Sequence, residues 1–314
     1  MKTAFTFPGQ GSQAVGMGRA LADAVPEAAA VFAEVDDALG EKLSDVIFNG
    51  PQDALTLTTN AQPALMAVSL AVIRALEARG FDLATRVDFV AGHSLGEYSA
   101  LAAAGSLSVG EAARLLRTRG EAMQRAVPVG EGAMAAVLGL DLPEATALAE
   151  AVAEGEVCQP ANDNGGGQVV LSGAKAAIDR AVARAPDFGA RRAILLPVSA
   201  PFHCAMMQPA ADEMREALAG ADLRAPAVPL VANVTAHPTS DPETIRDQLV
   251  DHVTGLVRWR ETVAWLAGDG VTLLAEIGAG KVLSGLARRI DRGAATQPVG
   301  TPDDIDNLLE TMGA

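Results

Sequence analysis

The stretch that most constrains the fold of this chain is residues 87–98, where an apolar segment runs into Gly92-His93-Ser94-Leu95-Gly96 and then into an alanine-rich segment. A buried strand, a sharp turn and a helix in this order are typical of a nucleophile elbow. Glycine is needed on both sides of Ser94 because any side chain there would collide where strand and helix cross. The turn would place the Ser94 hydroxyl at the start of the helix, where the free N–H of Leu95 can stabilise an oxyanion. The alternative interpretation is a tight turn with an incidental serine.

The composition of the 314-residue chain fits an α/β enzyme, since 49% of its residues are hydrophobic and 20% are charged. No segment reaches the roughly 18 consecutive apolar residues of a membrane helix, and no basic start precedes an apolar run. We therefore expect a cytoplasmic protein with no membrane contact. The two cysteines, Cys158 and Cys204, argue against a disulfide framework and a cysteine-based zinc site, so we expect no metal. A net charge of −15 argues against a nucleic-acid partner.

The order of the predicted elements divides the chain into two domains. Strands such as residues 3–7 alternate with helical patterns at both ends of the chain, which predicts a parallel sheet with an α/β-hydrolase-like core. From Pro128 onward, short strands and helices follow one another as β-α-β-β-α-β, the order of a ferredoxin-like unit. We expect a large domain formed by residues 1–127 and 199–314, with a smaller ferredoxin-like domain at 128–198 inserted into it.

The loop after the first predicted strand, Pro8-Gly9-Gln10-Gly11-Ser12-Gln13, contains glycines that let the backbone approach a ligand closely. It lacks the lysine of a phosphate-binding loop, so that interpretation fails. A loop at the carboxyl end of a parallel strand is where such folds bind ligands. Gln10 is therefore a candidate amide donor to an oxyanion, with a purely structural turn as the alternative.

Position in the chain also identifies a candidate base. His203 follows a proline-stiffened turn and precedes a predicted helix, whereas His237 and His252 lie in polar, loop-like contexts and look incidental. A structural role for His203 stays open on pattern alone. The predicted helix at 109–126 carries Arg119 among several arginines, and the pattern does not single it out.

Several motifs occur together, in one order and spacing: F-P-G-Q-G-S-Q from Phe7, G-H-S-L-G-E-Y from Gly92, T-R-G-E-A-M-Q from Thr118, P-F-H-C from Pro201 and I-G-A-G-K-V-L from Ile277. Over nearly its whole length the chain resembles the malonyl-CoA:acyl-carrier-protein transacylases of stand-alone bacterial fatty-acid synthesis. The resemblance implies transfer of a malonyl group from malonyl-CoA to the phosphopantetheine thiol of holo-acyl-carrier protein through a malonyl-serine, with ping-pong kinetics and no cofactor.

The same resemblance assigns roles to individual residues. Ser94 would be the nucleophile, and His203 its base, held by a backbone carbonyl in place of an aspartate. Arg119 would pair with the free carboxylate of the malonyl group. Gln10 and the N–H of Leu95 would form the oxyanion hole. Substrate would also contact a set of pocket residues: Gln62, His93, Asn162 and Phe202.

One position varies within the family. Relatives can carry glutamine where this chain has Arg258, and two interpretations are open. Its backbone carbonyl could be the group that orients His203, in which case the side chain would not matter. Alternatively, its side chain could change the charge near the site.

Other functions remain open on the sequence. A serine esterase or thioesterase uses the same elbow, but it needs an acid between serine and histidine, and residues 95–202 offer none in an obvious strand-end loop. An acyltransferase of polyketide synthesis and a catalytically dead carrier-protein scaffold are further alternatives. We expect a monomer whose acidic carrier protein docks on a local basic patch. The candidate residues for this patch are Lys281, Arg288 and Arg289, with Arg191 and Arg192 as further members.

Overall fold

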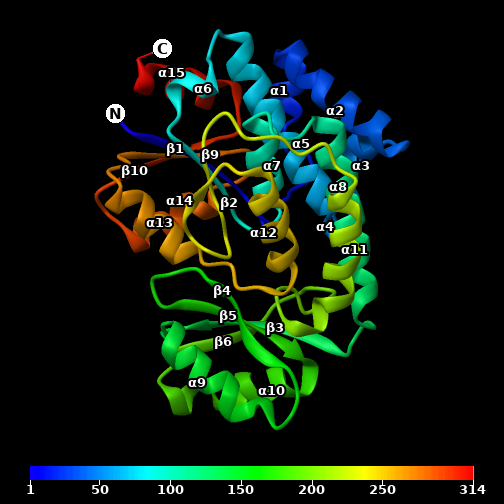
Figure 1. The fold of residues 1–314 in the computed structure, drawn as a ribbon, viewed down its shortest axis with the longest axis vertical. Coiled ribbons are helices and arrows are strands. Elements are labelled where there is room, and N and C mark those ends of the chain that lie inside the picture. Colours follow the sequence, from blue (N-terminus) through cyan, green and yellow to red (C-terminus); the bar gives the residue numbers. More distant parts are fainter. Residues whose placement is uncertain (314) are drawn as a thin grey trace.

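A computed structural model describes residues 1–313, and its centre is a six-stranded sheet in the order β10-β9-β1-β2-β7-β8 (Figure 1). All neighbouring strands pair in parallel except β8, which is antiparallel to β7. The strands are β1 (Thr3–Phe7), β2 (Phe89–Gly92), β7 (Leu230–Val231), β8 (Pro238–Thr239), β9 (Leu273–Ile277) and β10 (Ala295–Val299). Every residue of β1 and β9 is buried, as expected for parallel strands covered by helices on both faces.

Three helices pack against one another beside this sheet. The helix α5 (Thr58–Ala78) packs along α8 (Val109–Ala126) and α2 (Pro26–Leu39). It is long and apolar enough to cross a membrane by length and composition, but 83% of its most apolar window is buried inside the protein. In this structure α5 is therefore a core helix.

The start of α5 differs from the sequence prediction. In the sequence, Asn60 is a typical helix cap and Pro63 a typical first-turn residue, which predicts a helix over residues 64–79, but α5 begins at Thr58 and contains Pro63. A proline inside a helix loses its own backbone hydrogen bond and crowds the carbonyl four residues before it, but this cost need not end a helix that is buried in the core. Residues 58–63 are thus helical as well, at the edge of the site.

The remaining helices surround the large sheet or connect its strands. They are α1 (Arg19–Ala24), α3 (Leu43–Asn49), α4 (Gln52–Thr56), α6 (Leu83–Arg86), α7 (Gly96–Ala103), α11 (Gln208–Ala219), α12 (Pro242–Thr254), α13 (Trp259–Gly268), α14 (Val282–Ile290) and α15 (Pro302–Met312), with a short 3-10 turn at Ala205–Met207. Another 3-10 turn, Ala185–Phe188, packs in the core of the small sheet described next.

A second, antiparallel sheet has the order β4-β5-β3-β6, and its own apolar core lies under two helices. The helices α9 and α10 cover the face of this sheet that points away from the large sheet (Figure 1). These elements are β3 (Gly132–Leu138), α9 (Leu142–Ala153), β4 (Cys158–Asp163), β5 (Gln168–Ala174), α10 (Lys175–Arg184) and β6 (Arg192–Leu195). The β-α-β-β-α-β order and this topology confirm the predicted fold class, an α/β core with a smaller ferredoxin-like unit.

Backbone hydrogen bonds join the two units next to the site. Val257, in the segment before α13, donates to Ala161 O of β4 over 2.9 Å and accepts from Asp163 N over 2.9 Å. The strand β4 has a bulge between Pro160 and Asn162 at this point. The bulge and these two bonds fix β4 beside the carboxyl ends of the large sheet.

Candidate active site

The turn between β2 and α7 has the geometry of a nucleophile elbow. Ser94 has a φ of 53°, in the left-handed region that residues with a side chain rarely adopt. A Cβ on Gly92 would lie 1.9 Å from the carbonyl carbon of Gly96, and a Cβ on Gly96 would lie 2.2 Å from Phe7 O. The strained turn can therefore form only with glycine at both positions.

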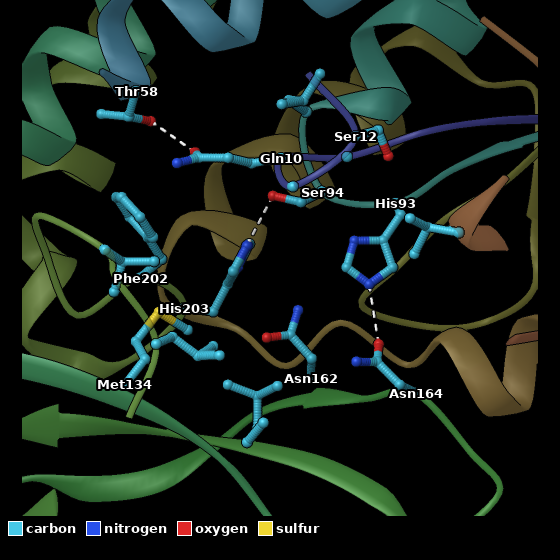
Figure 2. Close-up of a pocket in the computed structure, with 18 of the residues that line it drawn as sticks. Gln10, Ser12, Thr58, His93, Ser94, Met134, Asn162, Asn164, Phe202 and His203 are labelled. Carbon is cyan, nitrogen blue, oxygen red and sulfur yellow. Dashed lines mark hydrogen bonds between the residues drawn. The ribbon is translucent and has the colours of Figure 1, made fainter. Parts of the chain in front are cut away.

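Ser94 and His203 meet across this turn, although they are 109 residues apart in the chain (Figure 2). Ser94 Oγ lies 2.8 Å from His203 Nε2, and His203 Nδ1 lies 2.9 Å from the backbone oxygen of His252. A carbonyl oxygen can only accept, so Nδ1 carries the ring proton and Nε2 is free to take the proton of the serine hydroxyl. The geometry is that of a general base facing its nucleophile.

The environment of His203 keeps the imidazole neutral. Burial lowers the pKa of His203 well below its ordinary value of 6.5, and the neighbouring His252 and the guanidinium of Arg119 lower it further. At neutral pH the ring is therefore unprotonated and available as a base.

The orienting carbonyl is not the one that the sequence suggested. Arg258 donates its backbone N–H to Asn233 O, and its side chain pairs with Glu261, outside the residues that line the site. The interpretation in which the Arg258 carbonyl orients His203 is therefore wrong, and an effect of its side chain on the charge near the site stays a prediction. The view of His252 as an incidental loop residue is wrong as well, because it lies buried in the last turn of α12.

A layer of buried polar side chains lies behind the serine–histidine pair. His252 Nδ1 is 2.7 Å from Glu97 Oε2, and the other oxygen of Glu97 accepts the backbone N–H of Asn233 over 2.8 Å. The side chain of Asn233 in turn accepts the backbone N–H of Ser94 over 3.0 Å. Burial raises the pKa of Glu97 to about 7, an increase that the hydrogen bonds from Asn233 limit. The layer links the support of His203 to the backbone of the elbow.

Arg119 is a buried cation beside the nucleophile. Its side chain is 2% exposed, and it donates to Gln62 Oε1 over 2.7 Å and to Ser94 Oγ over 3.2 Å. Within residues 1–313 its hydrogen bonds thus go to neutral oxygens, and the nearby Glu97 is engaged with His252 and Asn233. A buried guanidinium without a hydrogen-bonded carboxylate is suited to bind one from a ligand.

Two backbone N–H groups near Ser94 are available to a ligand. Neither the N–H of Gln10 nor that of Leu95 donates to any group within residues 1–313. Leu95 directly precedes α7, so its N–H lies at the positive end of a helix. Both residues line the same cavity as Ser94. They are placed to receive negative charge that develops on a carbonyl oxygen.

The cavity has a volume of about 400 Å³ and lies between the carboxyl ends of the large sheet and one face of the small sheet (Figure 2). His93 Nε2 lies 3.0 Å from Asn164 Oδ1 on its wall. The cavity brings together most of the predicted site residues, namely Gln10, Gln62, His93, Ser94, Leu95, Arg119, Asn162, Phe202, His203 and Arg289. Lys281 and Arg288 are exposed but do not line it, and Arg288 donates to Thr296 on β10. In residues 1–313 no group of three or more His, Cys, Asp or Glu side chains could hold a metal ion.

Sequence reasoning missed four residues of this site: Thr58, Glu97, Asn233 and His252. Two of them left a signal. His252 follows Ile245 and Leu249 at helical spacing, on the buried face of α12. Asn233 comes just after β7, at the carboxyl end of a parallel strand. Nothing in the sequence marks Thr58 or Glu97 as polar partners within the site.

The comparison with known families agrees with this geometry. A family model described as "Acyl transferase domain" matches residues 4–292, which makes the chain an acyl transferase by fold and site. It is 45% identical, over 312 residues, to the malonyl CoA-acyl carrier protein transacylase of Bacillus subtilis, covering 99% of this chain and 97% of the relative. The chain therefore belongs to the malonyl CoA-acyl carrier protein transacylases, which confirms the resemblance noted in its motifs.

Solved structures agree with this family assignment. An acyl-carrier-protein-S-malonyltransferase from Bartonella henselae is 59% identical and superposes with a TM-score of 0.98 over all of both chains. A type II PKS acyl-carrier protein has been solved in complex with its malonyl-transacylase. That transacylase is 41% identical, with a TM-score of 0.96 over 99% of this chain and 100% of the other.

Proposed function

We propose that this protein transfers the malonyl group of malonyl-CoA to the phosphopantetheine thiol of a holo-acyl-carrier protein, with Ser94 as the covalent carrier. The main support for the proposal is the position of Arg119 beside Ser94. A buried guanidinium 3.2 Å from the nucleophilic oxygen is suited to an acyl group that ends in a second carboxylate, as malonyl does. The printed names of the relatives agree with this choice of substrate.

In the first half-reaction Ser94 Oγ attacks the thioester carbonyl while His203 Nε2 takes the hydroxyl proton. The resulting oxyanion receives hydrogen bonds from Gln10 and from the N–H of Leu95. When the tetrahedral intermediate collapses, the C–S bond breaks and the protonated His203 returns its proton to the sulfur of coenzyme A. Malonyl-Ser94 remains, with its free carboxylate against Arg119.

In the second half-reaction the phosphopantetheine thiol attacks the ester of malonyl-Ser94, and neutral His203 takes the thiol proton. Collapse of this intermediate breaks the bond to Ser94 Oγ, which recovers its proton from His203. The two half-reactions use the same groups in reverse, so the kinetics are ping-pong. Both are acyl exchanges between sulfur and oxygen, for which side chains suffice and no cofactor is required.

We also infer a division of the chain into a large domain, residues 1–127 and 199–314, and an inserted small domain, residues 128–198. It is supported by the separate apolar core of the small sheet, whose strands all fall between residues 132 and 195.

The exposed residues Lys281, Arg288 and Arg289 at α14 are the proposed docking surface for the acidic carrier protein. We propose a cytoplasmic monomer that supplies fatty-acid chain elongation.

The experiment that tests the function follows the malonyl group after mixing the protein with malonyl-CoA, with and without holo-carrier protein. Malonyl-carrier should form at a rate that depends on both substrates, with little free malonate. Rapid release of malonate, unchanged by the carrier protein, would instead identify a hydrolase. A panel of fatty-acid and polyketide carrier proteins tests the pathway, because one similar structure is bound to a type II PKS carrier.

A further inference from the structure

A continuous chain of hydrogen bonds connects Arg119 to Gln10 through two buried side chains that the proposed mechanism does not use. Arg119 donates to Gln62 Oε1 over 2.7 Å, and Gln62 Nε2 donates to Thr58 Oγ1 over 2.9 Å. Thr58 Oγ1 donates to Gln10 Oε1 over 3.0 Å (Figure 2). Arg119 also donates to Ser94 Oγ over 3.2 Å, so the chain links the nucleophile to the oxyanion loop.

The direction of every bond in this chain follows from the charge at one end. A guanidinium is only a donor, so Gln62 must present its carbonyl oxygen to Arg119 and its amide nitrogen to Thr58. The hydroxyl of Thr58 then accepts from Gln62 and has its single proton left for Gln10. Gln10 must therefore face Thr58 with its carbonyl oxygen. The polar group that its side chain leaves for the cavity is the N–H₂.

Because these side chains are buried, the direction of the hydrogen bonds cannot be reversed without leaving polar groups unpaired. Thr58 and Gln62 are each 1% exposed, and Arg119 is 2% exposed. Water cannot replace a lost partner there, so a reversed amide would set two donors or two acceptors against each other without compensation. Gln10 is only partly buried and is the one member of the chain that can turn.

We propose that Thr58 is a positioning residue of the acyl-transfer site: its hydroxyl, whose donor direction is set by Arg119 through Gln62, holds the Gln10 side chain by its carbonyl oxygen and so fixes the loop whose Gln10 backbone N–H faces the reacting oxygen. This inference rests on the proposed function. It adds that the carboxylate-binding arginine and the oxyanion-binding loop are coupled through Thr58. A loop released from Thr58 would no longer hold the Gln10 N–H in place for the developing oxyanion, and this would raise the barrier to attack by Ser94.

The test uses two acylating reagents, so that it does not depend on malonyl transfer alone. One is malonyl-CoA, and the other is the neutral reagent phenylmethylsulfonyl fluoride. With the latter, the bond from Ser94 Oγ to sulfur forms, the S–F bond breaks, and the hydroxyl proton goes to His203. The rate of adduct formation on Ser94 is measured by mass spectrometry for each variant of the full chain.

Four variants isolate the effect. Thr58→Val removes the hydroxyl at nearly constant shape, and Thr58→Ser restores it. Thr59→Val is the matched control, because Thr59 is the next residue of α5 but makes no side-chain hydrogen bond to residues 1–313. Gln62→Glu keeps an acceptor for Arg119 but cannot donate, so Thr58 must turn its proton to residue 62 and release Gln10.

We expect Thr58→Val to slow both reactions at least tenfold, with Thr58→Ser within about threefold of wild type and Thr59→Val unchanged. Gln62→Glu should slow sulfonylation by about the same factor as Thr58→Val, and the double variant should be no slower than the slower single variant.

Three outcomes would each overturn the proposal: sulfonylation of Thr58→Val at the wild-type rate, an equal loss in Thr58→Ser, or rate factors that multiply in the double variant. If Thr58→Val does not fold, Gln62→Glu and Thr58→Ser still decide. A wild-type protein that reacts with the fluoride but not with malonyl-CoA would instead refute the proposed function.

Discussion

The rings of His203 and His252 lie with their centroids 4.8 Å apart, and the backbone carbonyl of His252 accepts the Nδ1 proton of His203. A neutral carbonyl thus holds the position that a carboxylate takes in a catalytic triad. It fixes the tautomer as a carboxylate would, but it supplies less stabilisation to a protonated ring. Together with burial, this favours the neutral imidazole.

The lowered pKa of His203 predicts the pH dependence of acylation. The reaction needs the neutral ring, and a pKa below 6.5 keeps the ring neutral as the pH falls through 6.5. The rate of malonyl-Ser94 formation, measured by rapid quench, should therefore be flat from pH 8 to pH 6.5 and decline only at lower pH. A half-maximal rate at or above pH 6.5 would contradict the buried, carbonyl-bound histidine.

Replacing Arg119 tests substrate selection. Arg119→Ala should lower kcat/KM for malonyl-CoA by roughly 100-fold or more, with a much smaller effect on acetyl-CoA, because only malonyl presents a carboxylate. Arg119→Lys should recover part of the charge interaction but not the paired geometry. Arg114→Ala, at an exposed position of the same helix, is the control. Equal losses on both acyl-CoAs would remove Arg119 from this role.

The raised pKa of Glu97 predicts how stability depends on pH. A carboxyl with a pKa of 4.5 when unfolded and about 7 when folded stabilises the protein below pH 4.5, and this contribution is lost as the pH rises through 7. Between pH 5.5 and 8 the loss is roughly 2 kcal/mol.

The matched variant for this prediction is Glu97→Gln, which cannot ionise. Its free energy of unfolding in urea should gain roughly 2 kcal/mol relative to wild type over the same pH interval. Groups remote from Glu97 titrate alike in both proteins, so their contribution cancels in the difference. A difference that stays constant with pH would show that Glu97 ionises as an ordinary carboxyl.

The elbow glycines predict a strong contrast between two identical substitutions. Gly96→Ala would place a methyl group 2.2 Å from Phe7 O, and the main-chain atoms of β1 cannot move without disrupting the central sheet. The variant should be severely destabilised. Gly285→Ala, inside α14 with no atom near the added methyl group, should instead be neutral or gain up to about 1 kcal/mol. Urea unfolding of both variants measures the contrast, and similar stabilities would contradict the steric account.

Charge reversal at the proposed docking surface should act on the carrier protein alone. Lys281→Glu or Arg288→Glu should raise KM for the carrier protein severalfold, more at low salt, and leave KM for malonyl-CoA nearly unchanged. Lys175→Glu, on α10, makes the same change in net charge on the outer side of the small sheet and serves as control. An unchanged carrier KM in both test variants would place docking elsewhere.

The sequence predicted the elements that depend on neighbouring residues, such as tight turns and amphipathic helices. The apolar strand, the paired glycines and the alanine-rich helix around Ser94 identified the elbow, and helical periodicity identified α8 from Val109 to Ala126. The limits of α5 were missed because Pro63 was taken as a helix start. Burial of most of the helix outweighs the cost of this proline.

Long-range polar partners could not be predicted in the same way. The carbonyl that holds His203 belongs to His252, 49 residues away, and the partner of Gln10 is Thr58, 48 residues away. Such pairs depend on how helices dock, which periodicity does not specify. Arg258 was considered for the first role because of its motif, but the carbonyl that accepts the His203 proton belongs to His252 on α12.

The most direct test of the account is the site of acylation after a single turnover with malonyl-CoA, located by peptide mass spectrometry. The predicted result is one malonyl group on Ser94, absent in Ser94→Ala, formed far more slowly in His203→Ala, and lost from wild type when holo-carrier protein is added. A malonyl group on another residue, or equal labelling of Ser94→Ala, would contradict the assignment of Ser94 and His203 as the reacting pair.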